Sequence, residues 1–164
     1  MLEIVNHPEL TGRRNLPWKY SNTLPLSSEA IEKLVTAWNK EEKEFHFGIF
    51  LHASGDMVGY TEADWGWDPH CPGISVTIAP DQQRQGYGSE TLGLIVNYLF
   101  TETMAHNVSV WVADWNQAGK DFTLKLNFKS CGKERRSGVH DGRFYDHEVF
   151  DLLRPEWQSR QGDS

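Results

Sequence analysis

The sequence has little of what secreted or membrane-spanning proteins usually carry. Two cysteines, Cys71 and Cys131, in 164 residues give no disulfide framework, which favours a reducing compartment. The longest apolar run, residues 92–100, is far too short to span a bilayer. The N-terminus has neither the basic segment nor the long apolar segment of a signal peptide. We therefore expect a cytoplasmic protein without a membrane partner.

Patterns for metal and nucleic-acid binding are also missing. None of the seven histidines pairs as His-x-x-x-His, and His70 and Cys71 are adjacent rather than at the spacing of metal ligands. The formal net charge of −7 argues against nucleic acid, whose phosphate backbone requires a basic face. The sequence therefore predicts no metal and no nucleic-acid partner, and its acidic excess is compatible with a cationic substrate.

What is present is the composition of one globular domain. Hydrophobic residues are 38% and charged residues 24% of the chain, within the range of folded domains that can bury a core. No internal repeat or low-complexity linker divides the sequence. We expect a single domain over residues 1–164.

Hydrophobic periodicity predicts a mixed α/β sheet with helices on its faces. Ser27 is a suitable cap for a helix whose apolar stripe is Ile31, Leu34, Val35 and Trp38. The first 25 residues, rich in Pro, Asn and Gly, indicate irregular structure. The expected elements are a helix within residues 26–40, a hairpin over 44–67, a strand at 74–80, a helix at 89–104, a strand at 108–114, a short helix at 116–128 and a C-terminal hairpin that turns at 140–143.

The segment DQQRQGYGSE, residues 81–90, joins the expected strand at 74–80 to the helix that follows. Glycine costs backbone entropy, so Gly86 and Gly88 indicate a backbone that bends tightly or approaches a ligand closely. Such a loop before a helix N-terminus, with its unpaired N–H groups and partial positive charge, is suited to an anion. No Lys-Ser or Lys-Thr pair follows the glycines, and Thr91 replaces the third glycine of a Rossmann fingerprint. An ordinary turn with glycines for packing is the alternative.

The pattern that remains is Q/R-x-x-G-x-G/A, at Gln83, Gly86 and Gly88, and it resembles the pyrophosphate loop of the GCN5-related N-acetyltransferases (GNAT). The strand end at residues 78–80 and the segment WVADWNQAGKDFTLKLNF, residues 111–128, stand at the spacing of that family. The resemblance implies a GNAT fold, in which a mixed central sheet is splayed at the acetyl-CoA strand and helices lie on both faces.

The C-terminal tail resembles the RimJ/RimL-like branch, whose members close with an Asp-Gly-x-x-x-Asp hairpin and a terminal acidic residue followed by Trp. Here Asp141, Gly142, Asp146 and Trp157 stand at those positions. The resemblance is strongest over residues 25–157.

Three positions depart from the family pattern. The first strand and helix are shortened, so either MLEIV, residues 1–5, substitutes for the missing strand or that part of the sheet is absent. Gly119 stands where the branch often has Ser. Thr123 stands where many relatives carry a Tyr thought to protonate the leaving thiolate.

By resemblance, acetyl-CoA is the cosubstrate and lies along the strand at 74–80. The amide of Ile78 is the candidate for polarising the thioester carbonyl. Asn116 matches the position that steadies the pantetheine arm, and its alternative is a helix N-cap. The residues implied in binding acetyl-CoA are Thr77, Ile78, Gln83, Arg84, Gln85, Gly86, Tyr87, Gly88, Ser89 and Asn116.

The candidate bases lie on the strand GYTEAD. Tyr60, Glu62 and Asp64 alternate onto one face, so two carboxylates there suit a cationic amine and its proton. We expect Glu62 to be the base, with Asp64 second; a solvent-facing strand surface is the alternative. Tyr145 and Tyr87 are candidate proton donors to the thiolate, and a structural role is the alternative for each.

Two further side-chain groups have a structural interpretation as well. Asp146 is expected to be a hydrogen-bonding residue of the hairpin. A basic stretch is expected to form either a solvated face or a contact to the coenzyme A 3′-phosphate; it comprises Lys120, Lys125, Lys129, Lys133, Arg135 and Arg136.

Three functions remain open at this point. The first is an N-acetyltransferase for peptide or protein N-termini, as the branch resemblance suggests. The second acetylates a small amine such as an antibiotic, an amino acid or a polyamine. The third is a coenzyme-A-binding regulatory module without catalysis. A homodimer that covers an unpaired sheet edge is a further expectation.

Overall fold

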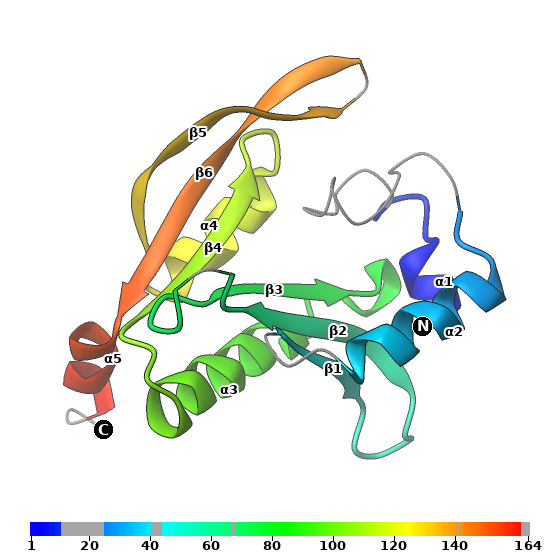
Figure 1. Ribbon diagram of the computed structural model, residues 1–164, viewed down its shortest axis with the longest axis horizontal. Helices are drawn as coiled ribbons and strands as arrows, with labels where there is room; N and C mark the ends of the chain where they lie inside the picture. The colour runs from blue at the N-terminus through cyan, green and yellow to red at the C-terminus, as the bar shows by residue number, and fades with distance from the viewer. Residues whose placement is uncertain (11–24, 41–43, 67, 141, 162–164) are drawn as a thin grey trace. The chain divides into compact units, whose positions relative to one another are not determined.

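The computed structural model describes residues 1–10, 25–40, 44–66, 68–140 and 142–161 and contains a mixed six-stranded sheet with helices (Figure 1). The strand order is β1-β2-β3-β4-β6-β5. The chain has two compact units, one of residues 1–64 and 75–92 and one of residues 65–74 and 93–164. The elements are α1 (Leu2–Val5), α2 (Ser28–Trp38), β1 (Glu44–Phe50), β2 (Met57–Asp64), β3 (Gly73–Ile78), the 3-10 turn η1 (Pro80–Gln82), α3 (Tyr87–Glu102), β4 (Asn107–Ala113), α4 (Gln117–Lys125), β5 (Lys129–His140), β6 (Arg143–Leu153) and α5 (Arg154–Gln161).

Helix α2 begins where the sequence predicts. The Ser27 hydroxyl accepts a hydrogen bond from the amide of Ala30 at 3.2 Å, which satisfies one of the unpaired N–H groups of the first turn. Ile31 is buried, and Leu34 and Trp38 pack against the same cluster. Val35 is exposed, so the apolar stripe is one residue narrower than predicted.

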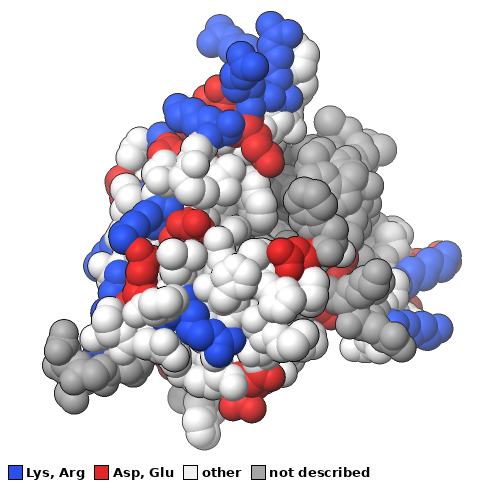
Figure 2. All heavy atoms as spheres, turned by 60° about the vertical axis from the view of Figure 1, so that its left-hand side comes forward, with Lys and Arg blue, Asp and Glu red and all other residues white. Residues whose placement is uncertain are grey.

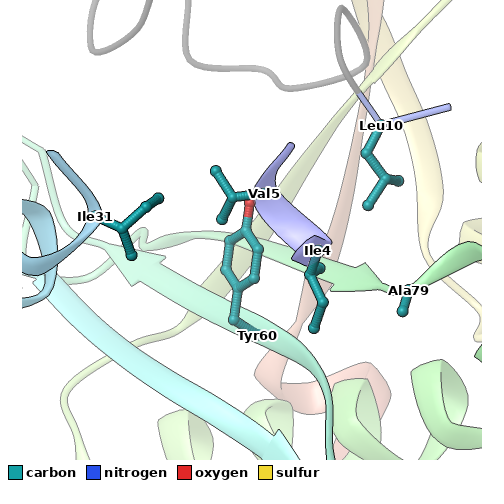
Figure 3. Close-up of a cluster of buried hydrophobic side chains, with 6 residues drawn as sticks. All are labelled: Ile4, Val5, Leu10, Ile31, Tyr60 and Ala79. Carbon is teal, nitrogen blue, oxygen red and sulfur yellow. The ribbon is translucent and has the colours of Figure 1, made fainter. Parts of the chain in front are cut away.

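The N-terminal segment forms a helical turn, α1, rather than a strand. Of the two alternatives for this segment, the one in which residues 1–5 substitute for a missing strand is therefore wrong. Ile4 and Val5 of α1 are buried beside Tyr60 of β2 (Figure 3). The free energy gained by burying these large apolar side chains against β2 outweighs their intrinsic preference for an extended strand.

Residues 11–24 lie outside the described residues. The segments before and after them are connected by the side chain of Asn6. Asn6 Nδ2 donates to the Leu26 carbonyl and Asn6 Oδ1 accepts from the Leu26 amide, each at 2.7 Å. This pair of hydrogen bonds holds α1 next to the start of α2, and Leu26 packs against the cluster of Figure 3.

Strands β1 and β2 form the expected antiparallel hairpin, with His46 opposite Glu62 and Glu44 opposite Asp64. Strand β3 lies next to β2 in the sheet. The Ala79 amide donates to the Val58 carbonyl at 2.8 Å, and Thr61 Oγ1 donates to the Ser75 carbonyl at 2.7 Å. A Cβ on Gly59 would lie 2.2 Å from the Thr77 carbonyl oxygen. Glycine is therefore required at residue 59.

In the second unit, the start of β3 pairs in parallel with β4 through Gly73 and Ser109. Strand β4 pairs antiparallel with β6, and β6 pairs antiparallel with β5. The predicted turn at 140–143 is consistent with this pairing, because His140 lies opposite Arg143 and Gly142 has φ of 73°; Asp141 itself lies outside the described residues. Phe150 and Leu152 of β6 are buried.

Helix α3 begins in the first unit and continues into the second, whereas α5 belongs to the second unit. Leu92, Ile95, Val96, Leu99 and Phe100 are all buried, which confirms the predicted stripe of α3. Helix α5, which the sequence did not indicate, is anchored by Arg154. Its guanidinium donates to the Thr103 and Ala105 carbonyls, and the Trp157 ring of α5 lies 5.5 Å from that of Phe100.

Within the described ranges no helix is long and apolar enough to cross a membrane. The expectations of a single domain and of a sheet splayed at β3 stay predictions.

Two leucines of α3 provide a test of the core. Leu99 is 0% exposed and Leu94 is 65% exposed. We expect Leu99→Ala to lower the free energy of unfolding by about 2–5 kcal/mol, because it leaves a cavity. Leu94→Ala, the matched control, is expected to change it by less than about 0.5 kcal/mol. Urea denaturation measures both, and equal losses would contradict this burial.

Candidate active site

The loop between β3 and α3 is tied to the end of β3 by a side chain. Gln83 Nε2 donates to the Ile78 carbonyl oxygen at 3.1 Å, and the Gln82 amide donates to the Ala79 carbonyl at 2.9 Å across η1. Gln83, the first residue of the family pattern, therefore holds the loop in a fixed place at the end of the strand.

The same loop has two residues in the left-handed region. Arg84 has φ of 63° and Gly86 has φ of 93°, and a Cβ on Gly86 would meet nothing within 4 Å. Glycine is thus used there for its backbone conformation and not for packing against a neighbour. Helix α3 begins immediately afterwards, at Tyr87, and the Glu90 amide donates to the Gly86 carbonyl at 3.0 Å.

The first turn of α3 carries the remaining residues that the sequence singles out, Tyr87, Gly88 and Ser89. The N–H groups of a first helical turn have no acceptor within the helix, so they are suited to an anion. The Tyr87 hydroxyl donates to Gln85 Oε1 at 3.3 Å, within the loop itself.

The face of β2 that carries the candidate bases is largely buried. Tyr60 is 6% exposed and the Glu62 side chain 12% exposed, so the solvent-facing alternative is wrong for these two residues. Ser75 Oγ donates to Glu62 Oε2 at 3.1 Å. The carboxylate of Glu62 is thereby linked to β3, three residues before Ile78. Asp64 lies at the end of β2, opposite Glu44.

A histidine that sequence reasoning missed lies beside Glu62. His46 of β1 is 5% exposed; its Nε2 is 2.8 Å from Glu44 Oε2, and its Nδ1 is 3.5 Å from Glu62 Oε1. The indole ring of Trp38 stacks on the imidazole with centroids 4.3 Å apart and planes 3° apart. The signal that could have found His46 is its alternation with Glu44 on β1, combined with the register of the hairpin.

In the second unit, Asn116 is the N-cap of α4. Its Oδ1 accepts from the Gly119 amide at 3.0 Å. The N-cap alternative is therefore realised, while Nδ2 remains a donor that the cap does not use. A Cβ on Gly119 would lie 2.6 Å from Asn116 Nδ2 and 3.0 Å from Val112 Cγ1. The departure from the family's Ser at residue 119 thus has a steric cause.

In this unit Thr123, which stands where many relatives carry a Tyr, is buried, and its hydroxyl donates to the Gly119 carbonyl at 2.8 Å. It holds α4 together and does not replace the family's tyrosine. Tyr145 of β6 is buried, which raises the pKa of its phenol above the ordinary value, so the hydroxyl keeps its proton near neutral pH. Beside it, burial lowers the pKa of His147, against the opposing charge of Glu134.

Asp146 has the structural role that the sequence predicts. Its Oδ1 accepts from the Arg136 amide at 2.8 Å, and its carbonyl accepts from the Asp114 amide at 2.9 Å. Arg136 has φ of 53° at a register shift in β5, so the Asp146 carboxylate stabilises this bulge.

The basic stretch is spread over α4 and β5. Figure 2 shows lysine and arginine side chains gathered over the β5–β6 hairpin, and Lys133, Arg135 and Arg136 of β5 are exposed. Arg135, Arg136 and Asp146 line a shallow depression there. Lys129 pairs with Glu156 of α5, so part of the stretch serves the fold.

The structure thus brings together two groups within the first unit. Ile78 and Gln83 are joined at the loop, and Glu62 is joined to Ser75 and His46. Asn116 and Tyr145 belong to the second unit. In the described part of the chain, no group of three or more His, Cys, Asp or Glu residues is arranged to hold a metal ion.

The model of the acetyltransferase (GNAT) domain family matches residues 1–129. The chain belongs to the GNAT family. Two curated relatives agree with this membership. The chain is 28% identical over 82 residues to the uncharacterized N-acetyltransferase YoaA of Bacillus subtilis, a match that spans 50% of the chain and 46% of that protein. It is 22% identical over 148 residues to the ribosomal protein uS5 alanine N-acetyltransferase of Escherichia coli, or 86% and 76% of the two chains.

The fold of this GNAT protein also resembles solved acetyltransferases. The spermidine N-acetyltransferase of Vibrio cholerae, in complex with CoA and spermine, superposes with a TM-score of 0.80 at 18% identity, over 95% of this chain and 89% of the other. The expected fold class is thereby confirmed. The family and its named relatives make the chain an acetyl-CoA-dependent N-acetyltransferase.

The steric account of Gly119 predicts the effect of restoring the family residue. We expect Gly119→Ser to displace the Asn116 side chain and break the cap of α4, lowering the free energy of unfolding by about 0.5–2 kcal/mol. Asn116→Ala removes the same cap, so adding it to Gly119→Ser should cost little more. Thermal unfolding of the single and double variants measures both effects. Fully additive losses would contradict the shared cause.

Proposed function

We propose that this GNAT protein acetylates the α-amino group of a peptide or protein N-terminus, as a member of the RimJ/RimL-like branch. The observation that carries the proposal is the hydrogen bond from Ser75 to Glu62. It links one buried carboxylate to the strand that also bears Ile78, so a proton acceptor is attached to the strand assigned to the acetyl group.

The residues proposed to hold acetyl-CoA fit an anionic, extended cosubstrate. The backbone amides of Gln85 to Ser89, with Gly86 open at its Cα, would accept the pyrophosphate at the N-terminus of α3. Arg84 and Gln83 shape this loop, and Tyr87 and Gly88 form its last turn. Backbone groups of Thr77 and Ile78 would pair with the pantetheine arm. In the second unit, Asn116, whose Nδ2 the cap of α4 does not use, is the residue that the family resemblance proposes for coenzyme A.

Acetyl-CoA supplies an activated acetyl group as a thioester. The ammonium group of the acceptor first loses a proton to Glu62, directly or through a water. The amine nitrogen then forms the C–N bond, while the N–H of Ile78 stabilises the charge that develops on the carbonyl oxygen. As the C–S bond breaks, its electron pair stays on sulfur and the nitrogen loses a second proton. One of the two protons ends on the thiol and one is released.

The small free-energy cost of deprotonation favours an α-amino acceptor. An α-amino group has a pKa near 7.7–8.0 and loses its proton at neutral pH for about 1 kcal/mol, whereas a lysine-like amine costs about 4–5 kcal/mol. One buried carboxylate is sufficient for the smaller cost. The similarity to an alanine N-acetyltransferase that acts on a ribosomal protein supports the same class of acceptor.

A small cationic amine is the second candidate. The observation in its favour is the resemblance to a spermidine acetyltransferase with spermine bound, together with the net charge of −7. Asp64, close to Glu62 on β2, would then bind a second ammonium group. A non-catalytic module is the third candidate, suggested by the short N-terminus, Gly119 and Thr123. Gly119 and Thr123 both have roles in the structure of α4, as described above.

The test is thiol release from acetyl-CoA with two pools, short peptides with free N-termini and small polyamines. We expect release with the peptides. Glu62→Gln is then expected to lower kcat by about 10²–10⁴-fold, the usual contribution of a general base, and Glu32→Gln, an exposed residue of α2, to leave it unchanged. Release with the polyamines alone would transfer the assignment to the second candidate. Binding of acetyl-CoA without release in either pool would favour the third.

The loop has its own test, independent of the acceptor. Gly86→Ala forces a side chain into a backbone with φ of 93°, at a cost of about 1–3 kcal/mol. We expect the affinity for acetyl-CoA, measured by calorimetry, to fall about tenfold. Gly93→Ala is the matched control, because Gly93 lies in α3 with open space around it and alanine favours a helix. An unchanged affinity in Gly86→Ala would argue against this loop as the anion site.

A further inference from the structure

Five side chains from four elements form a buried polar cluster in the first unit, which we name the His46 cluster. It consists of Trp38 of α2, Glu44 and His46 of β1, Glu62 of β2 and Ser75 of β3. Both ring nitrogens of His46 point at carboxylates: Nε2 lies 2.8 Å from Glu44 Oε2, and Nδ1 lies 3.5 Å from Glu62 Oε1. The mechanism proposed above gives no role to His46 or to Glu44.

The hydrogen-bond geometry fixes where the proton of a neutral ring lies. A carboxylate can only accept, so the contact of 2.8 Å to Glu44 places the hydrogen of His46 on Nε2. The lone pair of Nδ1 then faces a second acceptor, Glu62 Oε1. Neither Nδ1 nor Oε1 has a hydrogen-bond partner among the described residues, although both atoms are buried. One proton added between these two atoms would complete a hydrogen bond.

The surroundings of His46 are anionic and aromatic. Among the described residues, the groups that face the ring are the carboxylates of Glu44 and Glu62 and the uncharged indole of Trp38, while the Ser75 hydroxyl donates to the far oxygen of Glu62. An imidazolium would therefore lie between two carboxylates and against an aromatic face, which attracts a cation. The indole of Trp38, stacked on the imidazole with planes 3° apart, also restricts rotation of the ring.

We propose that His46 is a positioning residue that holds Glu62 and takes over the proton that Glu62 accepts from the acceptor amine. The inference rests on the function proposed above. The N–H bond of the ammonium breaks, and the proton goes to the Glu62 carboxylate. It then passes from Oε1 to Nδ1 of His46, while Nε2–H remains donated to Glu44. Glu62 is ionised again next to the attacking nitrogen, so it can receive the second proton.

The first measurement does not depend on turnover. Long-range ¹H–¹⁵N spectra of the histidine rings report which ring nitrogens carry hydrogen, followed between about pH 5 and pH 8, where histidine usually titrates. We expect Glu62→Gln to change the ring-nitrogen signals of His46, because a glutamine amide can donate to Nδ1 but cannot exchange a proton with it. The signals of His52, exposed in the turn of the same hairpin, serve as the internal control. Unchanged His46 signals would overturn the proposal whatever the enzyme's activity.

The second measurement is kinetic, with the acceptor found active. We expect His46→Gln to lower kcat by about tenfold to a hundredfold while the KM for acetyl-CoA changes less than about twofold, because only the chemical step loses its proton acceptor. His52→Gln is the matched control and should keep the wild-type kcat. Glu44→Gln, which retains an acceptor for Nε2 but not the charge, should give a smaller loss than His46→Gln. A wild-type kcat in a folded His46→Gln enzyme would overturn the proposal.

These measurements distinguish a failure of the proposed acceptor from a failure of the inference on His46. If no peptide is acetylated but Glu62→Gln still changes the His46 signals, the acceptor assignment fails and the proton sharing stands. If peptides are acetylated but the His46 signals do not respond to Glu62→Gln, the acceptor assignment stands and the inference on His46 fails.

Discussion

The side chain of Glu62 is only 12% exposed, and this burial constrains the strands and side chains that surround its carboxylate. A charge that leaves water is tolerated only where hydrogen bonds and opposite partial charges replace its hydration. One oxygen receives the Ser75 hydroxyl, and the other, without a hydrogen-bond partner among the described residues, faces Nδ1 of His46 at 3.5 Å. The partners come from β3 and β1, so three adjacent strands must keep their register for the carboxylate to be accommodated.

The same constraint explains why the N-terminal helices are needed. Helix α2 brings Trp38 over His46, and the ring of Trp38 also lies 6.0 Å from that of Tyr60. Tyr60 in turn packs against Ile4 and Val5 of α1 (Figure 3). The apolar cluster and the His46 cluster are therefore adjacent along β2, at residues 60 and 62. Helices α1 and α2 therefore pack on β2 beside both clusters.

Local chemistry accounts for what the sequence predicted well. The stripe of α3 repeats at helical spacing, the Ser27 cap precedes an apolar helix, and a loop with two glycines has few alternatives to a tight turn before α3. The misses have a different physical origin. Ile4 and Val5 favour a strand locally, but burial against Tyr60 decides their conformation. Helix α5 depends on Arg154 bonding to carbonyls 49 and 51 residues away, which no local pattern contains. His46 was missed because its meaning depends on the register that places it opposite Glu62.

The absence of a tyrosine at residue 123 and the presence of the His46 cluster are consistent with each other. A thiolate is a fair leaving group because a thiol ordinarily has a pKa near 8.5, so its departure does not require an acid from the protein. The attacking amine, by contrast, must lose two protons before the amide is formed. An enzyme without the tyrosine therefore benefits more from a base that can pass its proton to a second acceptor than from an acid that protonates the thiolate. The hydroxyl of Thr123 donates to the Gly119 carbonyl and so stabilises α4. His46, whose Nδ1 faces Glu62, would instead serve the removal of protons from the amine.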